Sequence, residues 1–385
     1  MNDHFLPFAS PDLGEEEIDQ VVETLRSGWL TTGPKTREFE EKFAAYLGGN
    51  IHAIAVNSAT AGLHLAIEAL GIREGDEVIT STHTFTATAE VARYVGADVR
   101  FVDIEPDTLN LDPRAVEAAV TPRTKAIIPV HFGGLTANME RLRTIGERYA
   151  ISVVEDAAHA FPSTYGGALI GTLKTAATVF SFYANKTMTT GEGGMLVTAS
   201  AELAERARVM RLHGISRDAF DRFVSKRPSW FYEVVAPGFK YNMTDIAAAI
   251  GICQLKKADD FRVKREAIAA RYAEALAELP ITLPVAASSG DLHSWHLFVI
   301  RLCAESKVDR DTFIQRMYDE GVGCSVHYVP LHLHPYWRDR YSLSPEMFPI
   351  SQKIFENAIS LPIYSKMSSD DVEKVISAVK KSLGV

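Results

Sequence analysis

The sequence predicts an α/β protein with a large domain, in which a mostly parallel central sheet lies between helices, and a smaller C-terminal α/β domain. Short apolar strands alternate with amphipathic helices through the first half of the chain, an order typical of parallel sheets with helices on both faces. The 385 residues are enough for a core divided between two domains. The pattern changes beyond about residue 279, after a long helical stretch, and we expect domains at residues 1–250 and 251–385.

The chain begins with two predicted helices. Residues 14–27 place apolar side chains on one helical face, and Gly28 provides a stop signal. After a loop, residues 35–47 repeat the pattern with Phe39 and Phe43 on one side.

The next part of the chain alternates strands and helices. Strands are expected at residues 52–56, 77–80, 99–102, 125–130, 151–155 and 178–182. Helices are expected at residues 63–70, 86–94, 114–120 and 139–149. Ligands of such sheets bind beyond the carboxyl ends of the strands. Four turns occupy that place, at residues 57–62, 81–85, 156–159 and 183–186.

The rest of the chain is less regular. A strand at residues 195–198 and a helix at 202–212 precede a long loop at 216–237, which we expect to be functional. A helical pattern then runs from about residue 244 to 279 with one break. The last elements are expected as strand, helix, strand and helix at residues 296–302, 310–318, 322–327 and 369–383.

Composition narrows the class of partner and compartment. The net charge of −9 argues against nucleic acid as the main partner. No window approaches the roughly 20 apolar residues of a membrane span, and the first residues lack the pattern of a signal peptide. Cys253, Cys303 and Cys324 have no metal-ligand spacing and are expected to be buried thiols in a reducing compartment. We therefore expect a cytoplasmic protein with no metal site.

Lys186 follows a predicted strand and precedes a glycine cluster at residues 191–194. A partly desolvated site or a nearby positive group lowers a lysine pKa, and the neutral amine can then form a Schiff base with an aldehyde. The alternative is an ordinary solvated lysine, since lysine is among the least buried residue types.

Asp156 lies at the end of another predicted strand. A carboxylate there can hold the protonated ring nitrogen of a cofactor and so keep the ring an electron sink. It can equally cap the turn that follows, and the two roles are compatible.

The other turns supply further candidate groups. Asn57–Gly62 has small side chains before a helix, which leave backbone N–H groups open to a phosphate or serve only packing. Ser181 can add a hydroxyl to the same phosphate or simply be a strand residue. Phe85 can stack on a planar ring or belong to the core, and His159 can donate to a ring oxygen or be structural. Together with the lysine and the carboxylate, these groups describe a pocket for pyridoxal 5′-phosphate (PLP).

Several motifs distributed along the chain share one family pattern. They are Phe5–Phe8, Ser27–Lys35, Ser58–His64, Thr121–His131, Glu155–His159, Lys186 with Gly191–Gly194, and Pro237–Asp245. On these motifs the chain resembles the DegT/DnrJ/EryC1/StrS family of PLP-dependent sugar aminotransferases. The resemblance implies a fold type I aminotransferase architecture and a homodimer with both active sites at the interface.

The resemblance also implies a role for each matching residue. Lys186 would be the Schiff-base lysine and proton shuttle, Asp156 would hold the pyridine nitrogen, and Phe85 would stack on the ring. His159 would meet the ring hydroxyl. The phosphate contacts would be Thr60, Ala61, Ser181 and, from the other subunit, Asn242.

The implied reaction moves an amino group from L-glutamate to a keto sugar carried on a nucleotide diphosphate. The motifs Phe5–Phe8, Thr121–His131 and His293–Arg301 look most like enzymes that make 4-amino sugars, including the UDP-4-amino-4-deoxy-L-arabinose type. This leaves UDP, dTDP and GDP open. Candidate contacts to the sugar nucleotide are Thr31, His327, Tyr328 and His332, although this histidine-rich loop can also be structural.

Three other functions stay open. One is amination of a 3-keto sugar, and another is the sugar dehydratase chemistry of the same fold. Because some dehydratases of the family carry a histidine where this chain has Lys186, the lysine favours transamination. The third is a non-catalytic PLP-binding regulator, for which no basic patch or helix-turn-helix is visible.

Overall fold

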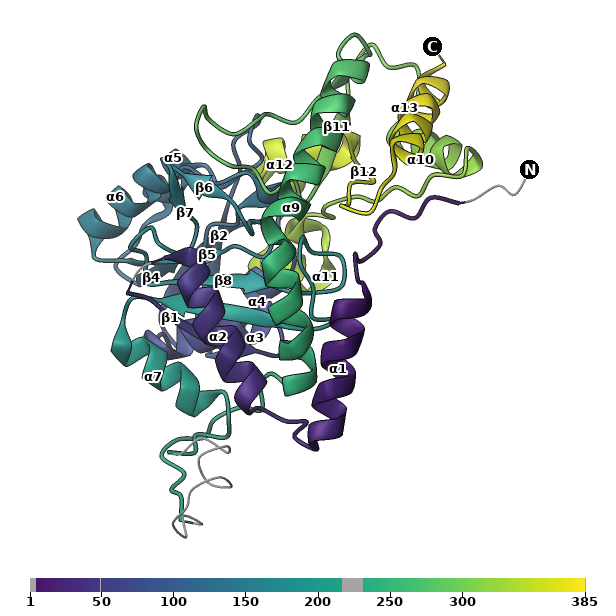
Figure 1. Cartoon of the computed structure of the whole chain (residues 1–385). Helices are drawn as coiled ribbons and strands as arrows, with labels where there is room; N and C mark the ends of the chain where they lie inside the picture. The colour runs from purple at the N-terminus through teal and green to yellow at the C-terminus, as the bar shows by residue number, and fades with distance from the viewer. Residues whose placement is uncertain (1–4, 49, 217–230, 385) are drawn as a thin grey trace.

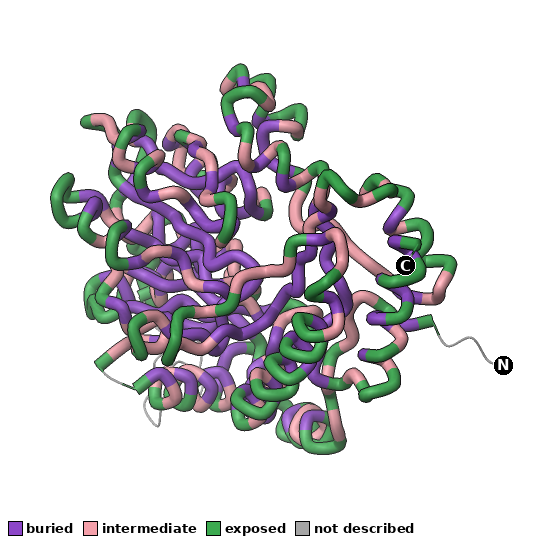
Figure 2. Tube along the Cα trace, turned by 90° about the horizontal axis from the view of Figure 1, so that it is seen from above, coloured by how far each residue is buried: buried purple, intermediate pink, exposed green. Residues whose placement is uncertain are grey.

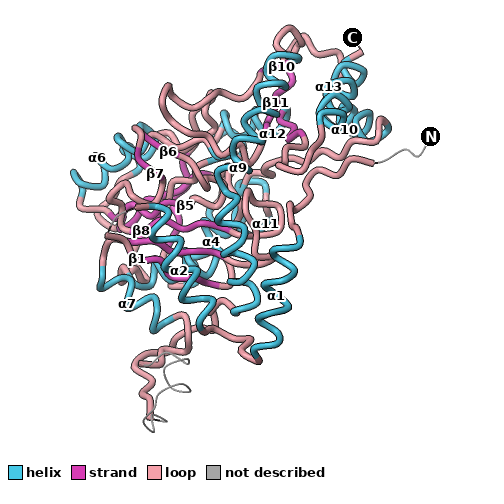
Figure 3. The backbone as a smooth tube through the Cα atoms, viewed as in Figure 1, coloured by secondary structure: helices cyan, strands magenta, loops and turns pink. Residues whose placement is uncertain are grey.

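The computed structural model describes residues 5–48, 50–216 and 231–384 and centres on a seven-stranded sheet (Figure 3). In sheet order, the strands are β1 (His52–Val56), β9 (Gly194–Thr198), β8 (Ala177–Ser181), β5 (Ser152–Asp156), β4 (Thr124–Ile127), β2 (Glu77–Ser81) and β3 (Asp98–Val102). The pairs from β8 to β3 are parallel, whereas β9 is antiparallel to both of its neighbours. The prediction of a mostly parallel sheet is confirmed.

Helices cover both faces of this sheet because each presents one apolar side to it (Figure 1). One face is covered by α2 (Pro34–Leu47), α5 (Pro113–Ala119), α6 (Met139–Tyr149) and the start of α9 (Asp245–Leu276). The other face is covered by α3 (Ala59–Ala69), α4 (Ala87–Tyr94), α7 (Ala201–Met210) and α11 (Pro335–Tyr341). Figure 2 shows buried residues concentrated along the interior of these layers.

A second, smaller sheet lies in the C-terminal part (Figure 3). Its antiparallel strands are β10 (Ile281–Thr282), β11 (Phe298–Leu302) and β12 (Ala358–Leu361). The helices of this part are α10 (Arg310–Asp319), α12 (Pro349–Asn357) and α13 (Ser369–Leu383). A hairpin of β6 (Thr164–Tyr165) and β7 (Ala168–Leu169) and the 3-10 helices η1 (Phe132–Gly134), η2 (Leu331–Leu333) and η3 (Pro345–Met347) complete the described elements.

Helix α9 connects the two cores. Its first half packs Ala248 and Ile252 against the central sheet, and its second half packs Ile268 and Tyr272 into the C-terminal core. Helix α1 (Glu15–Ser27) lies alongside it (Figure 1). The expected division between residues 250 and 251 falls within this helix, so we propose two domains that share α9.

The expected break in this helix is wrong, because α9 runs unbroken for 32 residues. It contains no proline, and its one glycine, Gly251, is accommodated by close packing. A Cβ at Gly251 would lie 2.7 Å from the Phe39 ring of α2. The glycine therefore serves the contact between two helices instead of interrupting one.

Three other expectations need correction. Residues 322–327 form no strand, only isolated bridges at Val322 and Ser325, and β12 supplies the third strand instead. Helix α3 begins at Ala59, inside the expected turn, because Ser58 caps it. Of the three cysteines, all free, only Cys253 is buried.

Two further expectations concern a loop and a membrane span. Most of the expected functional loop at residues 216–237, namely residues 217–230, lies outside the described residues. Among the helices that are described, none is both long enough and apolar enough to cross a membrane.

Candidate active site

Lys186 lies just beyond β8, at the carboxyl edge of the central sheet. Its Nζ is 3.4 Å from Nε2 of His296. Burial of the amine lowers the pKa of Lys186 to about 8, although the charge of Asp156 raises it. A substantial fraction of the amine is therefore neutral near pH 8, as nucleophilic attack on an aldehyde requires.

Asp156 is the last residue of β5 and is 5% exposed. Its Oδ2 accepts a hydrogen bond from the Thr88 hydroxyl at 2.7 Å, and its Oδ1 accepts one from the backbone N–H of Ala158 at 3.1 Å. Burial raises the pKa of Asp156, which Thr88, Ala158 and Lys186 counteract. Both roles left open from the sequence are geometrically possible, because Oδ1 caps the turn while the carboxylate stays at the sheet edge.

His159 is held between the backbone and Tyr328. The N–H of Gly133 donates to its Nδ1 at 3.3 Å, and its Nε2 lies 2.8 Å from the Tyr328 hydroxyl. Burial lowers the pKa of His159 well below its usual value, so the ring is neutral and its single proton is on Nε2. The N–H that we expected to meet a ring oxygen is therefore donated to Tyr328 in this structure.

Phe85 lies at the loop after β2 and is 59% exposed. Its ring centroid is 6.1 Å from that of Tyr328. A large aromatic side chain left this exposed beside buried polar groups is not part of the core. The alternative of a core phenylalanine is thus excluded, and its ring is available for stacking.

The phosphate candidates gather where α3 meets β8 and β9. Ser181 pairs with Gly194 at the strand ends, and a Cβ at Gly194 would lie 2.8 Å from the backbone N of Ala59. The N–H of Ala61 already donates to the Ser58 hydroxyl at 3.1 Å. The N–H groups of Ala59 and Thr60 precede the first helical hydrogen bond and are left for a ligand.

Asn242 lies beside the end of β1, where it forms a bridge with Val56. Its Nδ2 donates to the Thr32 hydroxyl of its own chain at 2.7 Å. The carbonyl of the neighbouring Thr31 accepts from the backbone N of Asp245 at 3.3 Å. The expected contact of Asn242 with a second subunit stays a prediction.

The structure separates the two histidines of the expected substrate loop. His327 precedes Tyr328 and lies 2.8 Å from the Ser360 hydroxyl through Nδ1. His332 is fully buried, with its ring stacked on Phe348 and its Nε2 3.0 Å from Oε1 of Gln352. A side chain with no exposed surface cannot touch a substrate, so His332 is not brought into the site.

Two residues of the site were missed from the sequence. Thr88, on α4, fixes the Asp156 carboxylate, and His296, before β11, contacts Lys186. The only signal for His296 was its place in the motif His293–Arg301. Nothing in the local pattern marks Thr88, because its partner is 68 residues away in the chain.

The chemical groups of these residues match the groups of PLP one by one. A partly neutral amine, a buried carboxylate, an exposed aromatic ring and open helix N–H groups correspond to its aldehyde, ring nitrogen, ring face and phosphate. The carboxylate has no arginine or lysine hydrogen-bonded to it among the described residues. A protonated ring nitrogen would supply the opposite charge.

The pKa of Lys186 gives a pH prediction. The rate at which PLP recombines with cofactor-free protein is expected to rise with pH, with a midpoint at about 8, and then to level off. The sign follows because a lowered lysine pKa leaves the reactive neutral amine above that pH. Absorbance after rapid mixing measures the rate. A profile that still rises steeply above pH 10, as the usual lysine pKa of roughly 10.4 would give, contradicts the prediction.

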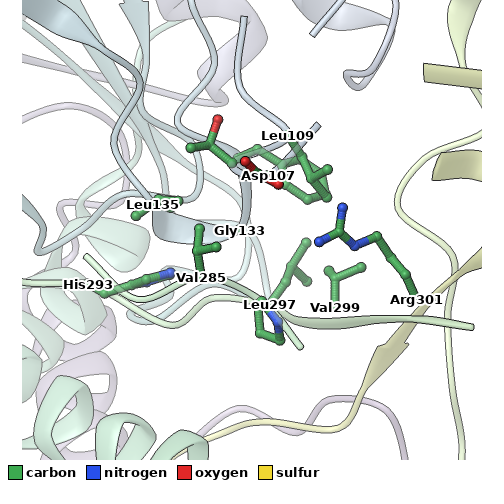
Figure 4. Close-up of a pocket in the computed structure, with 12 residues that line it drawn as sticks. Asp107, Leu109, Gly133, Leu135, Val285, His293, Leu297, Val299 and Arg301 are labelled. Atoms are coloured by element: carbon green, nitrogen blue, oxygen red, sulfur yellow. The ribbon is translucent and has the colours of Figure 1, made fainter. Parts of the chain in front are cut away.

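A separate pocket lies between the large and small sheets (Figure 4). Arg301 and His293 lie at opposite ends, with Leu297 and Val299 between them. None of the site residues expected from the sequence lines it. It adjoins the site through Gly133, whose N–H donates to His159, and through Phe132, whose ring contacts those of His159 and Tyr328.

Comparison with known proteins finds a family match and several similar structures. Residues 11–380 match the model of the DegT/DnrJ/EryC1/StrS aminotransferase family. The spore coat polysaccharide biosynthesis protein SpsC of Bacillus subtilis is 47% identical over 98% of this chain and 97% of its own. Spr1654 of Streptococcus pneumoniae, solved in a PLP form, is 34% identical with a TM-score of 0.91, covering 99% of each chain.

Two further solved structures are similar over nearly their whole length. DesV of S. venezuelae is 34% identical with a TM-score of 0.88, covering 99% of each chain. PseC of Helicobacter pylori, an aminotransferase involved in the biosynthesis of pseudoaminic acid, is 28% identical with a TM-score of 0.90, covering 98% of this chain and 99% of its own.

Proposed function

Because the chain belongs to the DegT/DnrJ/EryC1/StrS aminotransferase family, we propose that it transfers an amino group from L-glutamate to the 4-keto carbon of a nucleotide-diphosphate sugar. It is a PLP-dependent aminotransferase with a fold type I architecture. The observation that carries the proposal is the placement of Lys186 and Asp156 together at the edge of the central sheet. The relatives that act in polysaccharide and pseudoaminic acid synthesis support a sugar as the acceptor.

In this proposal Lys186 is the catalytic residue. When PLP is bound, its protonated ring withdraws electrons from the carbon that carries the amino group. The Lys186 amine removes the proton from the donor carbon and returns one to the cofactor side, and it can do both because its pKa is close to 8. The same steps in reverse load the amine onto the sugar.

The other residues bind and orient. Asp156 accepts the ring N–H, and Thr88 holds that carboxylate in place. The exposed ring of Phe85 would stack on the cofactor ring, and the start of α3 with Ser181 would bind the phosphate. His159 and Tyr328 form one hydrogen-bonded unit.

We also propose the setting of the reaction. The enzyme acts in the cytoplasm as a homodimer in which Asn242 reaches the partner's phosphate site. The product is an amino sugar for a surface polysaccharide, a lipopolysaccharide or a glycosylated metabolite. The tie to surface polysaccharide is supported by the name of SpsC.

Transfer of labelled nitrogen tests this function. The purified enzyme is incubated with nitrogen-labelled L-glutamate and a panel of UDP, dTDP and GDP sugars with a keto group at carbon 4 or carbon 3. We expect mass spectrometry to find the label in a 4-amino sugar of one nucleotide. Amination of 3-keto sugars alone contradicts the 4-keto assignment. Loss of a hydroxyl without nitrogen transfer establishes the dehydratase reading instead.

A further inference from the structure

Arg265 is a buried charge with no carboxylate partner in the described part of the chain. It lies on α9 and is 3% exposed. Its Nη1 donates to three backbone carbonyls, which are those of Ile363 at 2.7 Å, Trp295 at 3.1 Å and His296 at 3.5 Å. Its Nε has no hydrogen-bond partner. A buried guanidinium without a counter-ion costs free energy, which points to a role beyond packing.

Another buried arginine shows the ordinary arrangement. Arg211 is 5% exposed and forms an ion pair with the carboxylate of Glu40. The positive charge of Arg211 is therefore neutralised by that carboxylate. The charge of Arg265 has no such partner among the described residues and acts on the groups beside the carbonyls to which it donates.

Two of those carbonyls, of Trp295 and His296, belong to a strained turn. Trp295 has a φ of 48°, a left-handed conformation that bulky residues rarely adopt. Its N–H donates to Nδ1 of His293 at 2.9 Å, and the two rings stack with centroids 3.9 Å apart. Arg265 fixes the carbonyl at the other end of the same residue. The turn is thus held from both sides, and it determines where the next side chain, His296, points.

His296 points at the catalytic lysine. Its Nε2 is 3.4 Å from Nζ of Lys186, its ring centroid is 4.4 Å from that of His159, and it is 4% exposed. Its Nδ1 has no hydrogen-bond partner. Burial first, and then the charges of Lys186, His159, Arg265 and His327, lower the pKa of His296 well below its usual value. Asp156 acts on the lysine itself and raises its pKa.

We propose that Arg265 is a positioning residue that, through the carbonyls of Trp295 and His296, holds the buried and neutral His296 ring aimed at the Lys186 amine. A neutral imidazole offers one N–H and one lone pair, so it can orient either form of the amine. An imidazolium at His296 would place its positive charge 3.4 Å from the amine, which is itself positive when protonated. The imidazolium would also have no lone pair with which to accept a hydrogen bond from the amine. The purpose assigned to this arrangement rests on the proposed function, in which Lys186 both accepts and returns a proton.

The protonation of His296 can be measured without catalysis. The full-length protein, free of cofactor, is labelled on its histidines and titrated by NMR, with His296→Gln identifying the signal. In the wild type and in Arg265→Lys, which keeps the charge, the His296 signal is expected to show no protonation while the protein stays folded. In Arg265→Gln, which releases the turn and lets the ring leave its buried position, the titration midpoint of His296 is expected to move up by about one pH unit or more. The exposed Arg271→Met on the same helix serves as the matched control and should match the wild type.

A kinetic readout then separates this role from a purely structural one. The reaction of the PLP-loaded protein with L-glutamate is followed against pH in single turnovers. In Arg265→Gln the acid limb should move to higher pH by about the same amount, and adding His296→Gln to that variant should remove the shift. A fall in rate that is equal at every pH would mean a structural effect alone and would overturn the proposal.

Other outcomes also decide it. An unchanged His296 titration in Arg265→Gln overturns the proposal. If that variant does not fold, Arg265→Lys decides, because a His296 that titrates there like a free histidine shows that a cation at this position does not hold the ring in its buried place. A wild type that never reacts with L-glutamate refutes the proposed donor, but the NMR titrations still test Arg265 and His296.

Discussion

Replacing Lys186 with alanine is expected to abolish amino transfer. The variant loses both the amine that binds the cofactor aldehyde and the group that moves the proton. General acid–base catalysis alone contributes roughly 10²- to 10⁴-fold, so single-turnover amino transfer should fall by at least that factor. The measurement is the rate at which labelled nitrogen leaves glutamate in the presence of PLP.

Two other lysine variants separate the role of the amine from that of the charge and provide a control. Lys186→Arg keeps a positive charge but offers no neutral amine, because a guanidinium stays protonated. It should be as inactive as the alanine variant. Lys125→Ala, which removes an exposed lysine from β4, should keep wild-type activity. A Lys186→Arg enzyme with near wild-type rates would show that the charge matters and the amine does not.

Replacing Asp156 with asparagine is the second large expected loss. The change keeps the shape of the side chain but removes the charge that pairs with the protonated ring nitrogen. Losing one partner of a buried, hydrogen-bonded charge pair costs about 2–5 kcal/mol. At about 1.4 kcal/mol for each tenfold change, single-turnover amino transfer should fall roughly 30-fold to several thousandfold.

Thr88 provides a graded test of the same interaction. Thr88→Val removes one hydrogen bond to the carboxylate, which is worth about 1.5–3 kcal/mol for a charged acceptor. Its effect should lie in the same direction as that of Asp156→Asn and be smaller. Asp259→Asn, which changes the exposed partner of Tyr46, is the matched control and should leave the rate unchanged. Equal rates for Asp156→Asn and the wild type would exclude Asp156 from the ring nitrogen.

The fold was largely predictable because its signals are local. The alternation of strands and helices, the glycine stop after α1 and the apolar face of α2 are readable within one or two turns of chain. The predictions that were wrong concern elements whose position depends on partners far away in the sequence. The edge at β11 was taken by β12 and not by residues 322–327, because strand pairing is decided by packing between segments far apart.

The site residues also divide into those marked by a local signal and those that depend on distant contacts. Lys186, Asp156 and Phe85 lie at or just beyond strand ends, and the rule that ligands bind at strand ends was enough to place them near one another. His296 and Thr88 act through contacts across the sheet or between the two cores, which no local spacing marks. His332 was grouped with Tyr328 by its position in the sequence, yet packing against Phe348 buries it completely.

Visible absorbance with and without L-glutamate tests the central claim most directly. The purified protein loaded with PLP should show the yellow band of a cofactor joined to Lys186, and glutamate should bleach it. Lys186→Ala should lack that band. A wild-type band that glutamate leaves unchanged would contradict glutamate as the donor. Failure to form any band after soaking in PLP would contradict the site built from Thr60, Phe85, Asp156 and Lys186.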